Sequence, residues 1–184
     1  MLEIEVKSYC DDIALVKCQL ESMGALRLDT TKQIDIYFSH PCRRFAVTDE
    51  ALRIRKEEGH CTLVYKGPKI DLETKTRDEI EVEVSDCEQI ASILKKLGFD
   101  IAGKVVKERT VYRIGSLVVC LDEVEDLGSF VEIEYAGEDL EKGKREILSM
   151  MRELHLSGNE RRSYLELLLI KKSREMEDRS NENK

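Results

Sequence analysis

The chain carries one tripeptide three times, as Glu3-Ile4-Glu5, Glu79-Ile80-Glu81 and Glu132-Ile133-Glu134, each time with a helix-like segment downstream. In an extended strand neighbouring side chains point to opposite faces, so each copy puts two carboxylates on one side and an isoleucine on the other. Carboxylates a few ångströms apart repel one another and take up protons unless cations lie between them. The repeat therefore predicts a shared charged space that holds divalent metals or basic side chains.

Length and composition limit the classes of protein that fit. The 184 residues suit one domain with its own core, which we place at residues 1–172, followed by a charged and disordered tail over 173–184. Charged residues make up 37% of the chain against a norm of roughly a quarter, so many charges must be solvated or paired. The net charge of -8 leaves no basic surplus for a nucleic-acid duplex, and we expect no nucleic-acid partner.

Cysteine usage and hydropathy indicate the compartment. The six cysteines include no C-x-x-C pair, and no secretory segment precedes Leu2. We therefore expect reduced thiols in a cytoplasmic protein, although the even count leaves a disulfide framework open. No apolar run approaches the roughly 20 residues needed to span a bilayer, so we expect no membrane partner.

Strand and helix patterns alternate along the chain. Strands are expected at residues 2–7, 33–38, 51–56, 61–66, 79–84, 105–114, 116–123 and 131–135. Helices are expected at 13–23, 90–97 and 140–156, and a last helix or strand at 161–172. Hairpin turns fit at Gly59-His60 and Gly115-Ser116, so the sheet is predicted to be mostly antiparallel.

Basic residues follow the same alternation as the acids. The basic residues that share a face with a charged neighbour are Lys7 with Glu3 and Glu5, Arg53 with Arg55, and Lys107 with Arg109. A solvated face is the plainer interpretation, but such a face would tolerate Ser, Thr, Asn and Gln, and these positions are nearly all charged. Rolling the sheet into a barrel would place the charged face around a polar tunnel and the apolar face outward under the helices.

The residue types in that tunnel suit a polyanion. Oxygen ligands select Mg2+ or Mn2+, and Mg2+ is commonly held by a few carboxylates together with substrate phosphates. Guanidinium and ammonium groups would bind the remaining phosphate oxygens. The composition of the site therefore points to a phosphate chain.

An ordered set of motifs supports a family resemblance. It begins with the E-x-E-x-K signature Glu3-Ile4-Glu5-Val6-Lys7 and continues through Ala51-Leu52-Arg53-Ile54-Arg55, Leu63-Val64-Tyr65-Lys66-Gly67-Pro68, Lys107-Glu108-Arg109, Leu121-Asp122-Glu123-Val124, Phe130-Val131-Glu132-Ile133-Glu134 and Ser163-Tyr164. On these motifs the chain resembles the CYTH superfamily of CyaB-type (class IV) adenylate cyclases and thiamine triphosphatases, from Met1 to about Leu169. One departure is Ile36, where the family pattern has Thr.

The resemblance implies an α+β fold: a closed eight-stranded antiparallel β-barrel, the triphosphate tunnel, with helices packed on its outside. It implies catalytic roles for Glu5, Lys66 and Glu134. The implied ligands of Mg2+ or Mn2+ are Glu3, Glu5, Glu81, Asp122, Glu132 and Glu134, and the implied phosphate contacts are Lys7, Arg53, Arg55, Lys66, Lys107 and Arg109. For Glu79, Glu83 and Glu123, pairing with a neighbouring Arg or Lys is the favoured role.

Two chemistries share this apparatus. In a cyclase the ribose 3'-hydroxyl of ATP attacks the α-phosphorus and pyrophosphate leaves, and in a hydrolase water attacks the terminal phosphorus. The motifs look closest to the CyaB-like branch, which places class IV adenylate cyclase first. The alternative is a phosphohydrolase of inorganic triphosphate, thiamine triphosphate or a nucleoside triphosphate, and a third reading is a non-catalytic polyphosphate or nucleotide sensor. The oligomeric state stays open, although proteins of the resembled family are often homodimers.

Overall fold

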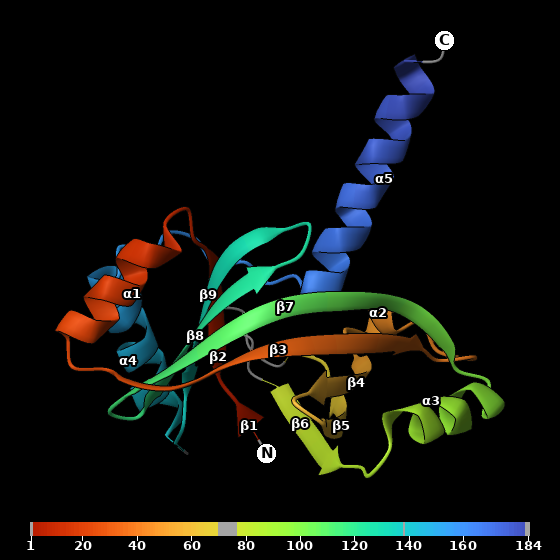
Figure 1. Ribbon diagram of the computed structural model, residues 1–184, viewed down its shortest axis with the longest axis horizontal. Coiled ribbons are helices and arrows are strands. Elements are labelled where there is room, and N and C mark those ends of the chain that lie inside the picture. Colours follow the sequence, from red (N-terminus) through yellow and green to blue (C-terminus); the bar gives the residue numbers. More distant parts are fainter. Residues whose placement is uncertain (1, 70–76, 138, 183–184) are drawn as a thin grey trace.

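The computed structural model describes residues 2–69, 77–137 and 139–182, without the side chains of residues 2, 3 and 180–182. In this part of the chain nine strands form one antiparallel sheet in the order β1-β6-β5-β4-β3-β7-β8-β9-β2 (Figure 1). The strands are β1 (Leu2–Glu3), β2 (Glu5–Tyr9), β3 (Leu26–Ser39), β4 (Ala51–Glu57), β5 (His60–Lys66), β6 (Arg77–Glu83), β7 (Asp100–Ile114), β8 (Leu117–Val124) and β9 (Gly128–Tyr135). The helices are α1 (Ile13–Ser22), α2 (Phe45–Thr48), α3 (Cys87–Lys96), α4 (Leu140–Glu153) and α5 (Tyr164–Glu182). The predicted α+β class and antiparallel sheet are confirmed.

Closure of the barrel is not observed. We expected a closed eight-stranded barrel, and the sheet instead curls into a half-barrel (Figure 1). Both ends of the strand order belong to the N-terminal segment: β1 pairs with β6 through only two residues, whereas β2 pairs with β9 over five. The strand breaks at Ile4, whose side chain is fully buried in the core and whose carbonyl accepts from the amide of Tyr135 at 3.1 Å. The expected single strand at 2–7 is therefore split where it passes from one edge to the other.

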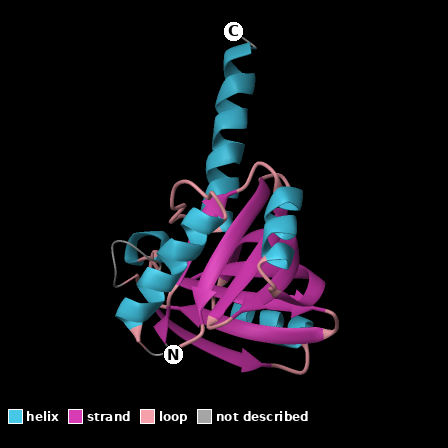
Figure 2. Ribbon diagram, turned by 90° about the vertical axis from the view of Figure 1, so that its left-hand side faces the viewer, coloured by secondary structure: helices cyan, strands magenta, loops and turns pink. Residues whose placement is uncertain are grey.

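Helices cover the apolar outer face as expected (Figure 2). Val16 and Leu20 of α1 and Ile147 and Met151 of α4 pack in one cluster with apolar residues of β2, β7, β8 and β9. Leu94 of α3 packs with outward residues of β3, β4 and β5 in another. Each such buried aliphatic side chain contributes about 1.5–3 kcal/mol relative to an exposed one.

Side-chain caps fix where these helices begin. The carboxylate of Asp12 accepts from the amide of Leu15 at 2.9 Å at the start of α1. Asp86 accepts from the amides of Glu88 and Gln89 at the start of α3, at 2.8 and 3.0 Å. Such a cap stabilises a helix by about 1 kcal/mol, because it satisfies amides that have no partner within the helix.

The C-terminal helix α5 runs from Tyr164 to Glu182 and projects away from the sheet (Figures 1 and 2). Of the segment 173–184, for which we predict a disordered tail, residues 183 and 184 lie outside the described residues. The first turns of α5 are buried: Tyr164, Leu167 and Leu168 pack against inward-facing residues of the sheet, among them Phe130. One end of the half-barrel is therefore filled by an apolar cluster that α5 completes. None of the described helices is both long and apolar enough to cross a membrane.

Two cysteines are bonded, which corrects the expectation of reduced thiols throughout. A disulfide joins Cys61 of β5 to Cys87, the first residue of α3, with their Cα atoms 5.6 Å apart. The two residues meet because α3 packs across the outer face of β5, a contact that their separation of 26 residues does not reveal. Cys10, Cys18, Cys42 and Cys120 are free thiols.

Candidate active site

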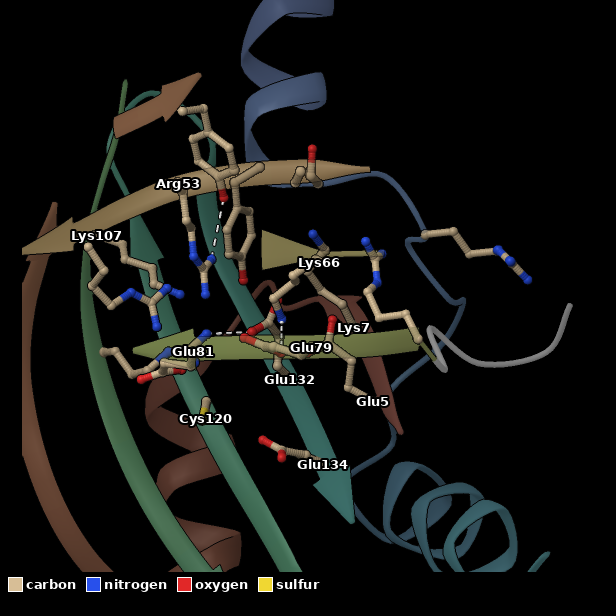
Figure 3. A pocket seen from close by; sticks show the side chains of 18 of the residues that line it. Glu5, Lys7, Arg53, Lys66, Glu79, Glu81, Lys107, Cys120, Glu132 and Glu134 are labelled. Atoms are coloured by element: carbon tan, nitrogen blue, oxygen red, sulfur yellow. Dashed lines mark hydrogen bonds and ion pairs between the residues drawn. The ribbon is translucent and has the colours of Figure 1, made fainter. Parts of the chain in front are cut away.

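A pocket of about 690 Å³ lies on the inner face of the half-barrel (Figure 3). The predicted site residues that line it are Glu5, Lys7, Arg53, Arg55, Lys66, Glu81, Lys107, Arg109, Glu132 and Glu134. They come from strands far apart in the sequence, and β-strand alternation turns them all to one side. Asp122 lies behind the lining, and the side chain of Glu3 is outside the described part of the structure.

Asp122 anchors one half of the basic wall. Its side chain is fully buried and accepts from Nζ of Lys107 at 3.0 Å and from Nε and Nη2 of Arg109 at 2.7 and 2.6 Å. Burial by itself would raise the pKa of this carboxyl, but Arg109 and Lys107 outweigh burial and hold the pKa below its ordinary value. Burial lowers the pKa of Lys107 to about 8, and the charge of Arg109 adds to the lowering. Asp122 is therefore a charged acceptor that fixes two cations.

Asp35 plays the same part for the other half of the wall. It receives a bidentate contact from Arg55 at 2.8 Å on each oxygen and a longer one from Arg53 at 3.4 Å. Burial would raise the pKa of Asp35, but the two guanidinium groups hold it well below the usual range. The Nε of Arg53 is buried and has no hydrogen-bond partner within the described residues. A buried donor without a partner is costly.

The opposite part of the pocket gathers carboxylates. In the view of Figure 3, Glu5, Glu132 and Glu134 lie below the basic side chains Arg53, Lys66 and Lys107. Glu5 and Glu134 stand directly opposite each other across the β2–β9 pair, and burial together with the charge of Glu5 raises the pKa of Glu134. Two acids forced together in this way favour a cation between them.

The carboxylates in the pocket fit a hard divalent cation that takes some of its ligands from the protein and the others from a substrate. Glu5 and Glu134 offer only oxygen donors, and Mg2+ and Mn2+ prefer oxygen ligands. Within the described residues, no three Asp, Glu, His or Cys side chains are close enough to enclose a metal ion by themselves. Mg2+ commonly uses one or two carboxylates and takes the remaining ligands from phosphates and water.

Several other acids form ion pairs within the described residues. Glu79, which also lines the pocket, pairs with Lys66 at 2.8 Å, the kind of partner favoured for it. Glu83 contacts His60, not an Arg or Lys, at 3.0 Å on the exposed surface. Glu132, expected as a metal ligand, forms an ion pair with Arg109. Glu81 lines the pocket from the exposed strand β6.

Some lining residues were missed by sequence reasoning. Tyr37, Arg77 and Cys120 follow the strand alternation of Asp35, Glu79 and Asp122, so the signal was present for them. Arg161 and Ser163 lie outside the strands, and Tyr164 is the first residue of α5. Only the Ser163-Tyr164 motif could have drawn attention to this segment.

Comparisons of sequence agree with this geometry. The family model of the CYTH domain matches residues 1–164. A candidate adenylate cyclase of Methanocaldococcus jannaschii is 42% identical over 172 residues, covering 91% of this chain and 98% of that protein. Adenylate cyclase CyaB of Aeromonas hydrophila is 29% identical over 140 residues, covering 74% of this chain and 70% of that protein.

Solved structures share the fold. A protein of Pyrococcus horikoshii is similar with a TM-score of 0.83 and 41% identity, covering 92% of this chain and 99% of that one. A candidate adenylyl cyclase of Hippeastrum, described as having a dominant triphosphatase activity, has a TM-score of 0.67 at 22% identity, covering 90% of this chain and 94% of that one.

Proposed function

The chain belongs to the CYTH domain family, and we propose that it is a divalent-metal-dependent enzyme acting on a triphosphate, first as a class IV adenylate cyclase that converts ATP to cyclic AMP and pyrophosphate. One observation carries the proposal. The opposed carboxylates Glu5 and Glu134 share a pocket with a basic wall whose cations are already oriented by Asp35 and Asp122. A site for anions alone would not need the carboxylate pair.

The chain's own residues hold the phosphate chain in place. Arg53 and Arg55 line the pocket and present N–H donors whose direction is set by Asp35. Lys107 and Arg109, held by Asp122, present further positive charge. Because these groups are oriented before the substrate arrives, little reorganisation opposes binding.

Mg2+ or Mn2+ bound by Glu5 and Glu134 would neutralise charge on the phosphates. In the cyclase reaction the ribose 3'-hydroxyl loses its proton to water as its oxygen forms a bond to the α-phosphorus, the bond from that phosphorus to the bridging oxygen of the β-phosphate breaks, and pyrophosphate leaves. The basic wall stabilises the negative charge that moves onto the leaving pyrophosphate. Lys66, paired with Glu79 at the pocket wall, is a further candidate for contact with this charge.

A second function is favoured by the lining of the pocket. Most of the residues that line it are charged, and the uncharged ones are Tyr37, Ala51, Ile80, Cys120, Ser163 and Tyr164. A phosphate chain satisfies such walls without an organic group. We therefore keep as the alternative a phosphohydrolase of inorganic triphosphate, thiamine triphosphate or a nucleoside triphosphate.

Product analysis tests the proposal. The purified protein is incubated with Mn2+ or Mg2+ and, separately, with ATP, thiamine triphosphate and inorganic triphosphate, and the products are separated by chromatography. Cyclic AMP with pyrophosphate supports the cyclase, and orthophosphate supports the hydrolase. Binding of a triphosphate without any product would overturn both and leave a polyphosphate or nucleotide sensor. Samples with a metal chelator provide the control, since both reactions are expected to stop in them.

A further inference from the structure

The segment before α5 is fastened along β2. We call residues 157–163 the closing segment. The hydroxyl of Ser8 donates to the carbonyl of Gly158 at 2.6 Å, and the amide of Glu160 donates to the carbonyl of Lys7 at 2.7 Å. These bonds join the closing segment to the strand that carries Glu5 and Lys7, and so they fix the position of the residue that follows it.

That residue, Tyr164, makes contacts on three sides. It is 5% exposed, and its hydroxyl donates to Oδ2 of Asp122 at 2.8 Å. Nζ of Lys7 lies 3.9 Å from the centroid of its ring, and Nζ of Lys107 lies 5.1 Å from the same centroid. The ring of Phe130 packs edge-on against it with centroids 5.0 Å apart.

The ammonium groups of these two lysines carry the same charge, and both are buried beside the ring of Tyr164. Lys7 and Lys107 are 1% and 2% exposed, and each lies within the range in which a ring face attracts a cation. Lys7 also donates to the carbonyl of Arg162 at 2.6 Å, so the closing segment and the ring act on it together. Both lysines line the pocket that would receive the phosphate chain.

We propose that Tyr164 is a positioning residue for the triphosphate: its ring directs the ammonium groups of Lys7 and Lys107 into the pocket, and its hydroxyl holds the Asp122 carboxylate against Lys107 and Arg109. The inference rests on the proposed triphosphate site. It makes the C-terminal segment part of that site, although Tyr164 itself performs no bond chemistry. The effect of Tyr164 is therefore on the affinity for triphosphate and on KM, with a smaller effect on kcat.

Two substitutions separate the ring from the hydroxyl. Tyr164→Leu removes both, and we expect a loss of roughly tenfold or more in affinity, because two cation–ring contacts disappear. Tyr164→Phe keeps the ring, and Asp122 keeps its three contacts from Lys107 and Arg109, so we expect a loss of about threefold or less. If Tyr164→Phe keeps most of the affinity that Tyr164→Leu loses, the ring of Tyr164 is the group responsible for that affinity.

Leu168→Ala is the matched control. Leu168 is 6% exposed in the same apolar cluster, and its truncation loosens the packing of α5 through a side chain that carries no charge or hydrogen-bonding group. Binding of inorganic triphosphate with Mg2+ is measured by calorimetry for the wild type and the three variants, together with thermal unfolding. We expect Leu168→Ala to lower Tm and to leave the affinity unchanged.

Each outcome decides the inference. Equal affinity of Tyr164→Leu and the wild type, or an equal loss in Leu168→Ala, would overturn it. A wild type that does not bind inorganic triphosphate would overturn both the inference and the proposed function. If the wild type binds, Tyr164→Leu binds more weakly and no triphosphate is turned over, the positioning role stands and the proposed enzyme activity fails.

A measurement on the wild type alone covers the case in which Tyr164→Leu does not fold. Nζ of Lys7 lies 3.9 Å from the centroid of the Tyr164 ring, so we expect the NMR signals of the adjacent methylene protons to be shifted upfield by the ring current. Signals at ordinary lysine positions would overturn the proposed arrangement.

Discussion

Two pairs of carboxylates on the inner face of the half-barrel have opposite surroundings. Asp35 and Asp122 are each buried against two basic side chains, which hold their pKa values low. Glu5 and Glu134 face each other, and the pKa of Glu134 is raised. The aspartates therefore serve the fold by fixing cations, whereas the glutamates lie opposite each other, where we propose that a metal ion binds. Identical strand alternation thus produces an internal scaffold in one place and a binding site in the other.

The largest expected effect breaks the scaffold. Asp122→Asn leaves Lys107 and Arg109 buried beside a neutral amide, and we expect the free energy of unfolding to fall by about 3–5 kcal/mol. Denaturant unfolding measures this change. If Asp122→Asn instead kept its stability and lost only its metal-dependent turnover, Asp122 would be a metal ligand, as the family resemblance implied.

Glu134→Gln is the opposite case. We expect turnover with Mg2+ or Mn2+ to fall by roughly 100-fold, about 2.7 kcal/mol in activation free energy, because one of the two proposed metal ligands is lost. Stability should be unchanged or slightly higher, since a repulsion with Glu5 is removed. Steady-state kinetics and denaturant unfolding are measured on the same preparation, with the exposed Glu125→Gln as control. Full activity of Glu134→Gln would contradict the metal assignment.

Arg53→Ala tests whether the cations held by Asp35 contact a ligand. We expect about tenfold weaker binding of inorganic triphosphate by calorimetry, since a charged donor to a phosphate oxygen is lost. Asp35 keeps its bidentate contact with Arg55, so the fold is expected to survive. Lys32→Ala, at an exposed ion pair on the surface, should bind normally. Unaltered affinity in Arg53→Ala would show that this arginine only neutralises Asp35.

The smallest effect is a pH dependence of stability. An aspartate with a lowered pKa in the folded protein stabilises the fold above its unfolded pKa of about 4 and loses this contribution as the pH falls. From about pH 5 to pH 3, the unfolding free energy of the wild type should therefore fall by about 1 kcal/mol more than that of Asp35→Asn. Parallel stability curves for the two proteins would mean that Asp35 is not held charged by its arginines.

Period-two alternation explains how far the sequence could predict this molecule. It assigned Glu5, Arg53 and Arg109 to one face because a strand leaves only two choices for each side chain. Alternation carries no information about which cations an acid meets across the sheet. A metal-binding role for Asp122 was implied by the family resemblance alone, and the contacts of Asp122 with Lys107 and Arg109 depend on the register between strands.

Other features were beyond a local pattern. Tyr164 begins a helix, where period two does not apply, and its neighbours come from β2, β7 and β8. The Cys61–Cys87 disulfide depends on the packing of α3 over the sheet. The break of the N-terminal strand at Ile4 depends on how far the sheet curls, and all the paired strands together set that curl.

The split N-terminal strand sets the order of events during synthesis. β2 has its hydrogen-bonded neighbour in β9, near the other end of the sheet-forming part of the chain. β2 therefore leaves the ribosome long before its partner strand β9 has been made. Contacts so distant in sequence form slowly, because closing the long loop between them costs entropy before any contact is gained. The pocket is consequently one of the last parts of the molecule to assemble, and a chain truncated before β9 would lack the partner strand of Glu5 altogether.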